Sequence, residues 1–203
     1  MKIICVGLNY RSHAAEMNRP VPSEPMIFLK PDSALLKNNK PFYIPDFSED
    51  LQYEAEIVLR ISRLGKGIAV KYADRYFDAL TAGIDFTARD WQARFSKAGH
   101  PWELSKTFDG SAPVGSFISK ESFPDMADIS FALGINGITR QSGNTSDLIF
   151  SFNEIISYVS RFYTLKTGDL IFTGTPSGVG PVRRGDNLVA EIEGEVVLDF
   201  FAR

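Results

Sequence analysis

Leu51-Gln-Tyr-Glu-Ala-Glu-Ile-Val-Leu-Arg-Ile-Ser62 is the stretch that decides the fold, because apolar residues alternate along most of its length. Strict alternation indicates a half-buried β-strand, since successive side chains point to opposite faces of a sheet. Glu54 and Glu56 have the same parity and therefore project from one face of this strand. Two carboxylates on one face repel each other unless protons, cationic side chains or a metal ion compensate. On this pair alone, two exposed surface glutamates are the simpler interpretation, and a divalent metal site is the alternative.

The composition is that of an ordinary globular protein with a single domain over residues 1–203. The net charge of −3 and the absence of a basic run argue against a nucleic-acid partner. No apolar segment approaches the roughly 20 residues that span a bilayer, and the N-terminus lacks the features of a signal peptide. Cys5 is the only cysteine, so no internal disulfide forms. We therefore expect a cytoplasmic protein that binds neither nucleic acid nor a membrane.

Local patterns elsewhere predict a β-rich α+β fold with a few short helices. Strands are expected over residues 2–6, 26–29, 42–44, 81–87, 129–136, 138–141, 169–173, 188–192 and 195–200, and helices over 10–17, 75–80, 89–97 and 152–162. The expected N-caps of these helices are Asn9, Asp74, Asp85 and Ser151. Asn136-Gly137 is a strong signal for a two-residue hairpin turn. Ser151 and Glu154 also have the spacing of a capping box.

Four further residues carry side chains suited to chemistry. His13 and Glu16 lie three positions apart in one expected helix, so they share a face and can touch. A carboxylate that orients an imidazole makes a general base for activating water, although in isolation a weak surface pair is the simpler interpretation. Asp85 is a third carboxylate at a strand end, and Lys106 taken alone is an ordinary solvated lysine. The Gly-rich loop 174–181 lacks the Gly-Lys-Ser/Thr of a phosphate-binding P-loop.

Six short motifs, taken together, resemble the fumarylacetoacetate hydrolase family. In chain order they are Val6-Gly-Leu-Asn-Tyr10 with His13 and Glu16, Phe28-Leu-Lys-Pro31, Tyr53-Glu-Ala-Glu56, Gly83-Ile-Asp-Phe-Thr-Ala-Arg-Asp90, Lys106-Thr-Phe-Asp109 and Thr173-Gly-Thr-Pro-Ser-Gly-Val-Gly180. Each motif is weakly specific, but six in register cover nearly the whole chain. The pattern is most similar to the short, single-domain acylpyruvases and oxaloacetate decarboxylases, which lack the N-terminal domain of true fumarylacetoacetases. Asp32 and His100 depart from the family pattern, and we interpret His100 as structural.

The resemblance implies a mixed β-roll fold and a homodimer. It implies that Glu54, Glu56 and Asp85 bind Mg²⁺ or Mn²⁺ and leave coordination positions open for substrate. A mobile lid of about residues 8–25 would carry the catalytic dyad of His13 and Glu16, and Lys106 would be a third catalytic residue. The residues implied for the substrate pocket are Arg89, Gln92, Lys106 and Thr175.

The charges of these residues lead to a hypothesis about the reaction. Three carboxylates and one Mg²⁺ sum to −1, and Lys106 and Arg89 offset this deficit for an anionic substrate. We expect cleavage of a carbon–carbon bond beside a pyruvoyl group, through a metal-stabilised pyruvate enolate. In an acylpyruvate, His13 would activate water to attack the distal carbonyl, whereas oxaloacetate would lose CO₂ to give the same enolate.

Two other classes of function stay open. One is an isomerase or tautomerase of an enolic or unsaturated 2-oxo dicarboxylate, similar to 2-hydroxyhepta-2,4-diene-1,7-dioate isomerase, and hydratase-like relatives are a further possibility within the family. The other is a non-catalytic protein that binds metal and 2-oxo acids. The complete set of His13, Glu16, Lys106 and three acids argues against the non-catalytic alternative, because a binding protein has no need of the dyad.

Overall fold

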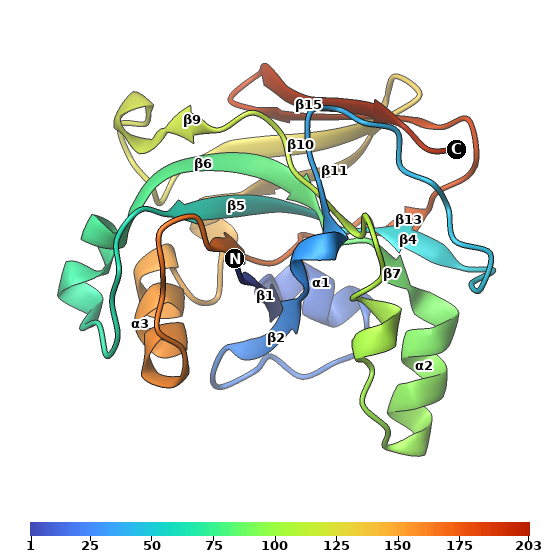
Figure 1. The fold of residues 1–203 in the computed structure, drawn as a ribbon. Coiled ribbons are helices and arrows are strands. Elements are labelled where there is room, and N and C mark those ends of the chain that lie inside the picture. The colour runs from blue at the N-terminus through green and yellow to red at the C-terminus, as the bar shows by residue number, and fades with distance from the viewer.

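The computed structural model describes residues 1–203, and its largest sheet has six strands in the order β2-β1-β12-β5-β6-β9 (Figure 1). Their bounds are β1 (Ile3–Gly7), β2 (Met26–Lys30), β5 (Ala55–Ile61), β6 (Phe77–Ile84), β9 (Ile118–Ser119) and β12 (Leu170–Phe172). β1 pairs in parallel with β12, and every other neighbouring pair in this sheet is antiparallel. The sheet is therefore mixed, as the resemblance implied.

A second sheet of four antiparallel strands lies above β5 and β6 in Figure 1, in the order β11-β10-β14-β15. Its strands are β10 (Ser130–Ile135), β11 (Ile138–Asn144), β14 (Asn187–Ile192) and β15 (Glu195–Phe201). Ile57 and Leu80 of the first sheet and Leu133 and Leu188 of the second belong to one core of 35 buried residues. The two sheets thus enclose the main hydrophobic core between them.

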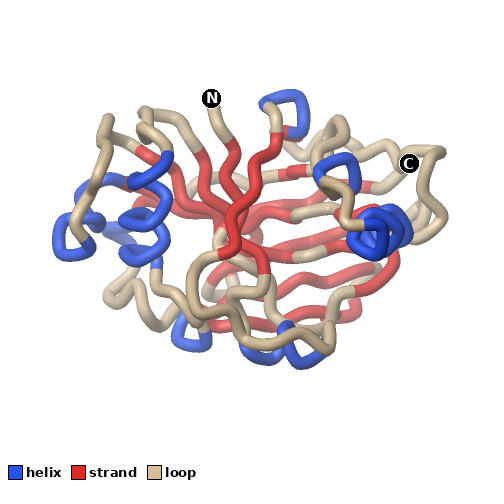
Figure 2. Tube along the Cα trace, turned by 90° about the horizontal axis from the view of Figure 1, so that it is seen from below, coloured by secondary structure: helices blue, strands red, loops and turns tan.

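Short strands and helices occupy the periphery, as Figure 2 shows with the strands crossing the middle of the molecule. The small sheets are β13 (Gly180–Pro181), β4 (Leu51–Tyr53) and β7 (Thr87–Ala88) in one group, and β3 (Leu35–Leu36) with β8 (Ala112–Pro113) in another. The α-helices are α1 (Arg11–Glu16), α2 (Arg89–Ala98) and α3 (Phe152–Phe162). The 3₁₀ helices are Asp32–Ala34, Val70–Tyr76, Glu103–Ser105, Lys120–Ser122 and Thr145–Asp147. The fold is therefore α+β and rich in strands, as the sequence predicted.

The segment 51–62 forms two strands, because the chain leaves one sheet and enters another at Glu54. β4 belongs to the three-stranded sheet, whereas β5 lies inside the six-stranded sheet between β12 and β6. β5 is buried on both faces: Ile57 packs in the main core, and Val58 packs in a second cluster of nine buried residues. The prediction of a half-buried strand is therefore wrong, since apolar residues cover both faces of this sheet.

Two turn and cap predictions are confirmed in detail. Asn136 and Gly137 both have positive φ, at 53° and 77°, as a type I′ turn between β10 and β11 requires. The main-chain N–H of Ser151 donates to Glu154 Oε2 at 2.8 Å, and the Ser151 hydroxyl accepts from the Glu154 N–H, which completes the capping box of α3. Local side-chain chemistry was sufficient to predict both features.

Asn9 does not cap α1, which begins after Tyr10 without a side-chain cap. The Asn9 side chain is completely buried and donates to the carbonyl oxygens of Phe150 and Thr173, at 3.0 and 2.8 Å. Its own Oδ1 accepts from the Phe150 N–H at 2.8 Å. The prediction failed because long-range partners satisfy this amide, which ties the start of α1 to two distant loops.

The expected helix over residues 75–80 is wrong, and so is its cap at Asp74. The 3₁₀ helix Val70–Tyr76 ends where β6 begins at Phe77. From there the chain pairs with β5 along its whole length, and this tertiary pairing overrides the local helical signal.

Two smaller predictions also fail. Ala88 occupies the N-cap position of α2, so Asp85 is not a cap. Residues 42–44 make a single bridge, between Phe42 and Ala202, instead of a strand. No helix of this fold is both long and apolar enough to cross a membrane.

Candidate active site

Three acids meet where β5 begins and β6 ends. Glu54 lies at the break between β4 and β5, Glu56 lies two residues further along, and Asp85 directly follows β6. The register pairs Ala55 with Ile84, and the Asp85 N–H donates to the main-chain oxygen of Glu54 at 2.8 Å. One carboxylate oxygen from each acid lies within 4.8 Å of the others, and all three residues are buried. The antiparallel pairing of two strands therefore brings these acids together.

Three cations surround the acids. Lys106 Nζ lies 2.7 Å from Glu54 Oε2 and 2.6 Å from Asp85 Oδ2. Arg89 Nη2 lies 2.5 Å from Glu54 Oε1. Lys30 Nζ lies 2.7 Å from Asp85 Oδ1, although this contact lacks the direction of a hydrogen bond. Three carboxylates thus face three cationic side chains, and Glu56 is the acid without an ion pair.

These contacts separate the protonation behaviour of the two glutamates. Burial alone would raise the pKa of Glu54, but Lys106 and Arg89 hold that pKa well below its usual range. Burial, Asp85 and Glu54 together raise the pKa of Glu56 well above its ordinary value. Burial lowers the pKa of Lys106, but Asp85 and Glu54 outweigh this effect and raise it, so the lysine stays charged.

The donor set of Glu54, Glu56 and Asp85 fits a divalent metal ion. Clustered carboxylate oxygens are the ligands that Mg²⁺ and Mn²⁺ prefer. A cation between the acids would offset the repulsion that raises the pKa of Glu56, and this glutamate would bind as a carboxylate. The chemistry of the three side chains therefore suits a hard cation better than it suits a packed core.

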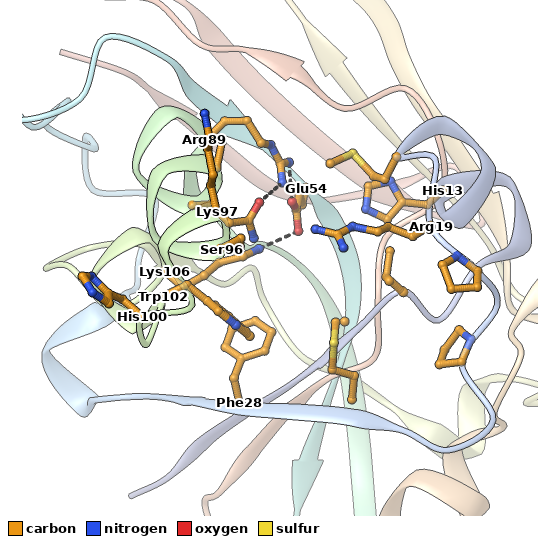
Figure 3. Close-up of a pocket in the computed structure, with 18 of the residues that line it drawn as sticks. His13, Arg19, Phe28, Glu54, Arg89, Ser96, Lys97, His100, Trp102 and Lys106 are labelled. Atoms are coloured by element: carbon orange, nitrogen blue, oxygen red, sulfur yellow. Dashed lines mark hydrogen bonds and ion pairs between the residues drawn. The ribbon is translucent and has the colours of Figure 1, made fainter.

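A cavity of about 960 Å³ opens at Glu54 (Figure 3). Glu54 and Lys106 line it, and His13 faces Arg89 across it (Figure 3). Arg89 and Gln92 are lining residues that belong to α2. Arg19, Lys97, His100 and several apolar residues also line it. His100, which we interpreted as structural, therefore lies in the cavity wall.

His13 and Glu16 form a hydrogen-bonded pair at the edge of this cavity. His13 Nδ1 lies 3.0 Å from Glu16 Oε2, and the imidazole is buried. The other oxygen of Glu16 accepts a hydrogen bond from the Gly178 N–H at 2.9 Å. One carboxylate thus orients the imidazole and also ties α1 to the Gly-rich loop.

Thr175, which was expected in the substrate pocket, is buried and is not among the residues that line the cavity. Its hydroxyl accepts from Gln141 Nε2 at 2.8 Å. Gln141 Oε1 in turn accepts from the N–H of Ala55, the residue between the two glutamates. The neighbouring Gly174 N–H donates to Glu56 Oε2 at 2.7 Å. The Gly-rich loop therefore supports the acid cluster from behind.

Sequence reasoning missed Lys30, Gln141 and Arg19. Lys30 lies inside the motif Phe28–Pro31, and this position could have marked it as a site residue. Its side chain is buried, which no local pattern predicts. Gln141 lies 86 residues from Ala55 in sequence, and no local pattern joins them. Arg19 follows α1 in the proline-rich stretch and carries no motif.

A buried acid cluster beneath a cavity with a histidine–glutamate pair is the arrangement of an enzyme active site. Comparison with known families agrees, because the model of the fumarylacetoacetate (FAA) hydrolase C-terminal family matches residues 2–199. The chain belongs to this family. It is therefore similar to enzymes over almost its whole length.

Similar proteins of known name include tautomerases, hydrolases and isomerases. The mitochondrial oxaloacetate tautomerase of Mus musculus is 43% identical over 198 residues, which are 98% of this chain and 90% of the relative. The oxaloacetate tautomerase of Escherichia coli is 38% identical over 194 residues, which are 95% of this chain and 89% of the relative.

The solved structures that are similar to this chain include a hydrolase and an isomerase. The fumarylpyruvate hydrolase of Pseudomonas aeruginosa, in complex with Mn²⁺ and pyruvate, has a TM-score of 0.93 and 35% identity, with 100% of this chain and 89% of that chain covered. The 2-hydroxyhepta-2,4-diene-1,7-dioate isomerase of Mycobacterium marinum has a TM-score of 0.86 and 34% identity, with 99% of this chain and 73% of that chain covered.

Proposed function

We propose that this protein is a divalent-metal-dependent enzyme that converts a 2-oxo acid through its enolate. The observation that carries the proposal is that His13, which is bonded to Glu16, and Lys106 line the same cavity as Glu54, one of the three clustered acids. The named relatives support it, because oxaloacetate, fumarylpyruvate and hydroxyheptadienedioate are all 2-oxo acids or their enols.

In this proposal Glu54, Glu56 and Asp85 hold Mg²⁺ or Mn²⁺. When bound, such an ion acts as a Lewis acid on the carboxylate and keto oxygens of the substrate. The Lys106 ammonium stays protonated because two carboxylates raise its pKa, and it stabilises the negative charge of the enolate oxygen. Arg89 keeps Glu54 in place through its ion pair.

The first candidate reaction is cleavage of a carbon–carbon bond beside the pyruvoyl group. His13 Nδ1 is bonded to Glu16, so Nε2 accepts a proton from water as the water oxygen bonds to the distal carbonyl carbon of an acylpyruvate. The bond from this carbon to pyruvoyl C3 breaks, and its electron pair forms the enolate. The proton then passes from His13 to C3, which leaves pyruvate and a carboxylic acid. Oxaloacetate would instead lose CO₂, without an attacking water.

The second candidate is tautomerisation of oxaloacetate, and the names of the mammalian and bacterial relatives favour it. His13 would remove a proton from C3 of the keto form, and the enolate oxygen would then be protonated. No carbon–carbon bond breaks in this reaction. The two candidates use the same residues, but His13 takes its proton from water in hydrolysis and from C3 in tautomerisation.

The experiment that tests the proposal compares acetylpyruvate, fumarylpyruvate and oxaloacetate on purified, EDTA-treated protein with and without added Mg²⁺ or Mn²⁺. Pyruvate release and the ultraviolet absorbance of the enol are followed together. Metal-dependent pyruvate release supports cleavage, and a metal-dependent change of enol absorbance without pyruvate supports tautomerisation. Binding of oxalate without any turnover would favour a non-catalytic protein, and neither binding nor turnover would contradict the proposal.

Two further expectations stay predictions. The homodimer follows from the family resemblance and is tested by light scattering on the purified protein. The cytoplasmic location is tested by fractionation, which matters because the mammalian relatives are mitochondrial.

A further inference from the structure

The cavity wall carries far more positive than negative charge. Among its lining residues Glu54 is the one acid, and both of its oxygens are already bonded to Arg89 and Lys106. The wall also contains Arg19 and Lys97, with no acid of the wall left to pair with them. A cavity with this charge is built for an anion with more than one negative group.

Arg19 is the guanidinium in the wall that is free to bind a ligand. Its side chain makes no ion pair or hydrogen bond within the protein. Figure 3 shows it turned into the cavity from the His13 side. Arg89, by contrast, donates to Glu54, Gln92 and Gln52, so its hydrogen-bonding capacity is largely used.

Arg19 enters the cavity from the His13 side, opposite Arg89 and Lys106 (Figure 3). The main-chain N–H of Arg19 donates to the Ala14 oxygen at 2.9 Å, so this residue is fixed to the end of α1. Lys97 lies in the last turn of α2, across the cavity from α1 (Figure 3). The wall is also partly apolar, with Met17, Pro20, Met26 and Phe28. These features match a molecule with an apolar chain and an anionic group at each end.

We propose that Arg19 is a specificity-determining residue that binds the second carboxylate of an elongated 2-oxo dicarboxylate. This inference rests on the proposed function, in which the first carboxylate binds beside Lys106. A guanidinium binds a carboxylate through two parallel hydrogen bonds. The volume of about 960 Å³ leaves ample room for an acyl chain between the two carboxylates.

The test uses two 2-oxo acids of equal chain length, 2-oxoadipate and 2-oxohexanoate, which lack the bond that the cleavage reaction breaks and differ in the second carboxylate. Calorimetric titration of the Mn²⁺-loaded protein should give about tenfold tighter binding of 2-oxoadipate. Arg19→Gln should remove this preference, and Arg19→Lys should retain part of it. Arg11→Gln is the matched control, because Arg11 is exposed on α1 and does not line the cavity.

Equal binding of the two ligands by the wild type would overturn the inference, and so would an unchanged preference in Arg19→Gln. Oxalate separates this failure from failure of the proposed function. If oxalate binds and the dicarboxylate preference is missing, the role of Arg19 is wrong and the inner site stands. If neither oxalate nor the two 2-oxo acids bind, the proposed function fails and the role of Arg19 fails with it.

Discussion

Lys30 Nζ lies 2.7 Å from Asp85 Oδ1, and the exposed fractions of the two side chains are 0% and 1%. The same ammonium donates to the main-chain oxygens of Lys106 and Ser111 and to the Ser111 hydroxyl. Lys30 therefore joins β2, the end of β6 and the loop that carries Lys106. It also supplies the third cation of the cluster. Because three cations already balance the three carboxylates, a bound divalent metal would add positive charge that favours an anionic substrate.

Lys30→Met should destabilise the protein by about 3–5 kcal/mol, because Asp85 would lose a buried partner. Mn²⁺ should restore more stability to this variant than to the wild type, since the added cation replaces part of the lost charge. Lys2→Met is the control, because Lys2 pairs with the buried Asp169 in a different part of the fold. Thermal unfolding with and without Mn²⁺ measures all three proteins. An equal response to Mn²⁺ in both variants would contradict the role of Lys30 in the cluster.

Glu56→Gln should change how the metal-free protein responds to pH. The folded-state pKa of Glu56 is raised, so its contribution to stability is present below the ordinary glutamate pKa and is lost as pH rises through the raised value. The wild type should therefore lose stability relative to Glu56→Gln as the pH rises above the ordinary glutamate pKa, by about 2–4 °C in melting temperature for each kcal/mol of unfolding free energy.

Added Mn²⁺ should stabilise the wild type and have little effect on Glu56→Gln, because the amide is a poor ligand. Mn²⁺ affinity of the wild type should rise with pH, since binding displaces a proton from Glu56. Glu195→Gln, at an exposed position, should behave as the wild type. Parallel pH profiles for the wild type and Glu56→Gln would show that Glu56 does not titrate as described.

Gly174→Ala should lower both stability and metal affinity. Gly174 has φ of +104°, and an added Cβ would lie 2.6 Å from Asn9 Cβ. Positive φ alone costs roughly 1–2 kcal/mol for an alanine, and the overlap adds to it. Gly185→Ala separates the two effects, because Gly185 has φ of +90° and nothing within 4 Å of the added carbon. We expect Gly185→Ala to lose about 1–2 kcal/mol with normal Mn²⁺ affinity, whereas Gly174→Ala should also displace the N–H that binds Glu56.

Glu16→Gln and Glu16→Ala should each lower kcat by about 10–100-fold on the 2-oxo acid that the wild type converts fastest, because His13 loses its charged partner. Their effects on the loop should differ. The amide oxygen of Gln can still accept from the Gly178 N–H, so only Glu16→Ala should speed hydrogen exchange at that amide. Mn²⁺ affinity should stay unchanged in both. Full kcat in Glu16→Gln would show that the charge of Glu16 is not required.

The sequence predicted the parts of this molecule that depend on short-range chemistry. The Asn136-Gly137 turn and the Ser151 capping box follow from residues that are neighbours in the chain. The antiparallel pairing of β5 and β6 places Asp85 beside Glu54, so the acids that the motifs singled out do lie together.

Other features depend on partners far along the chain. Asn9 has the chemistry of a helix cap, yet its amide bonds to loops 141 and 164 residues away. Lys30 is a buried cation because Asp85 and two distant main-chain oxygens surround it. β5 is covered on both faces by apolar layers that its own alternation did not reveal. Such contacts arise from the assembled fold, and a local pattern contains no information about them.

The central claim is that Glu54, Glu56 and Asp85 hold the divalent ion on which enolate chemistry depends. The measurement that tests it most directly is a Mn²⁺ titration of EDTA-treated wild type and Asp85→Asn, with conversion of oxaloacetate followed in the same samples. We predict one Mn²⁺ per chain in the wild type, at least about 100-fold weaker binding in Asp85→Asn, and conversion that follows metal occupancy. Equal Mn²⁺ binding by the two proteins, or conversion by the wild type without any metal, would contradict the claim.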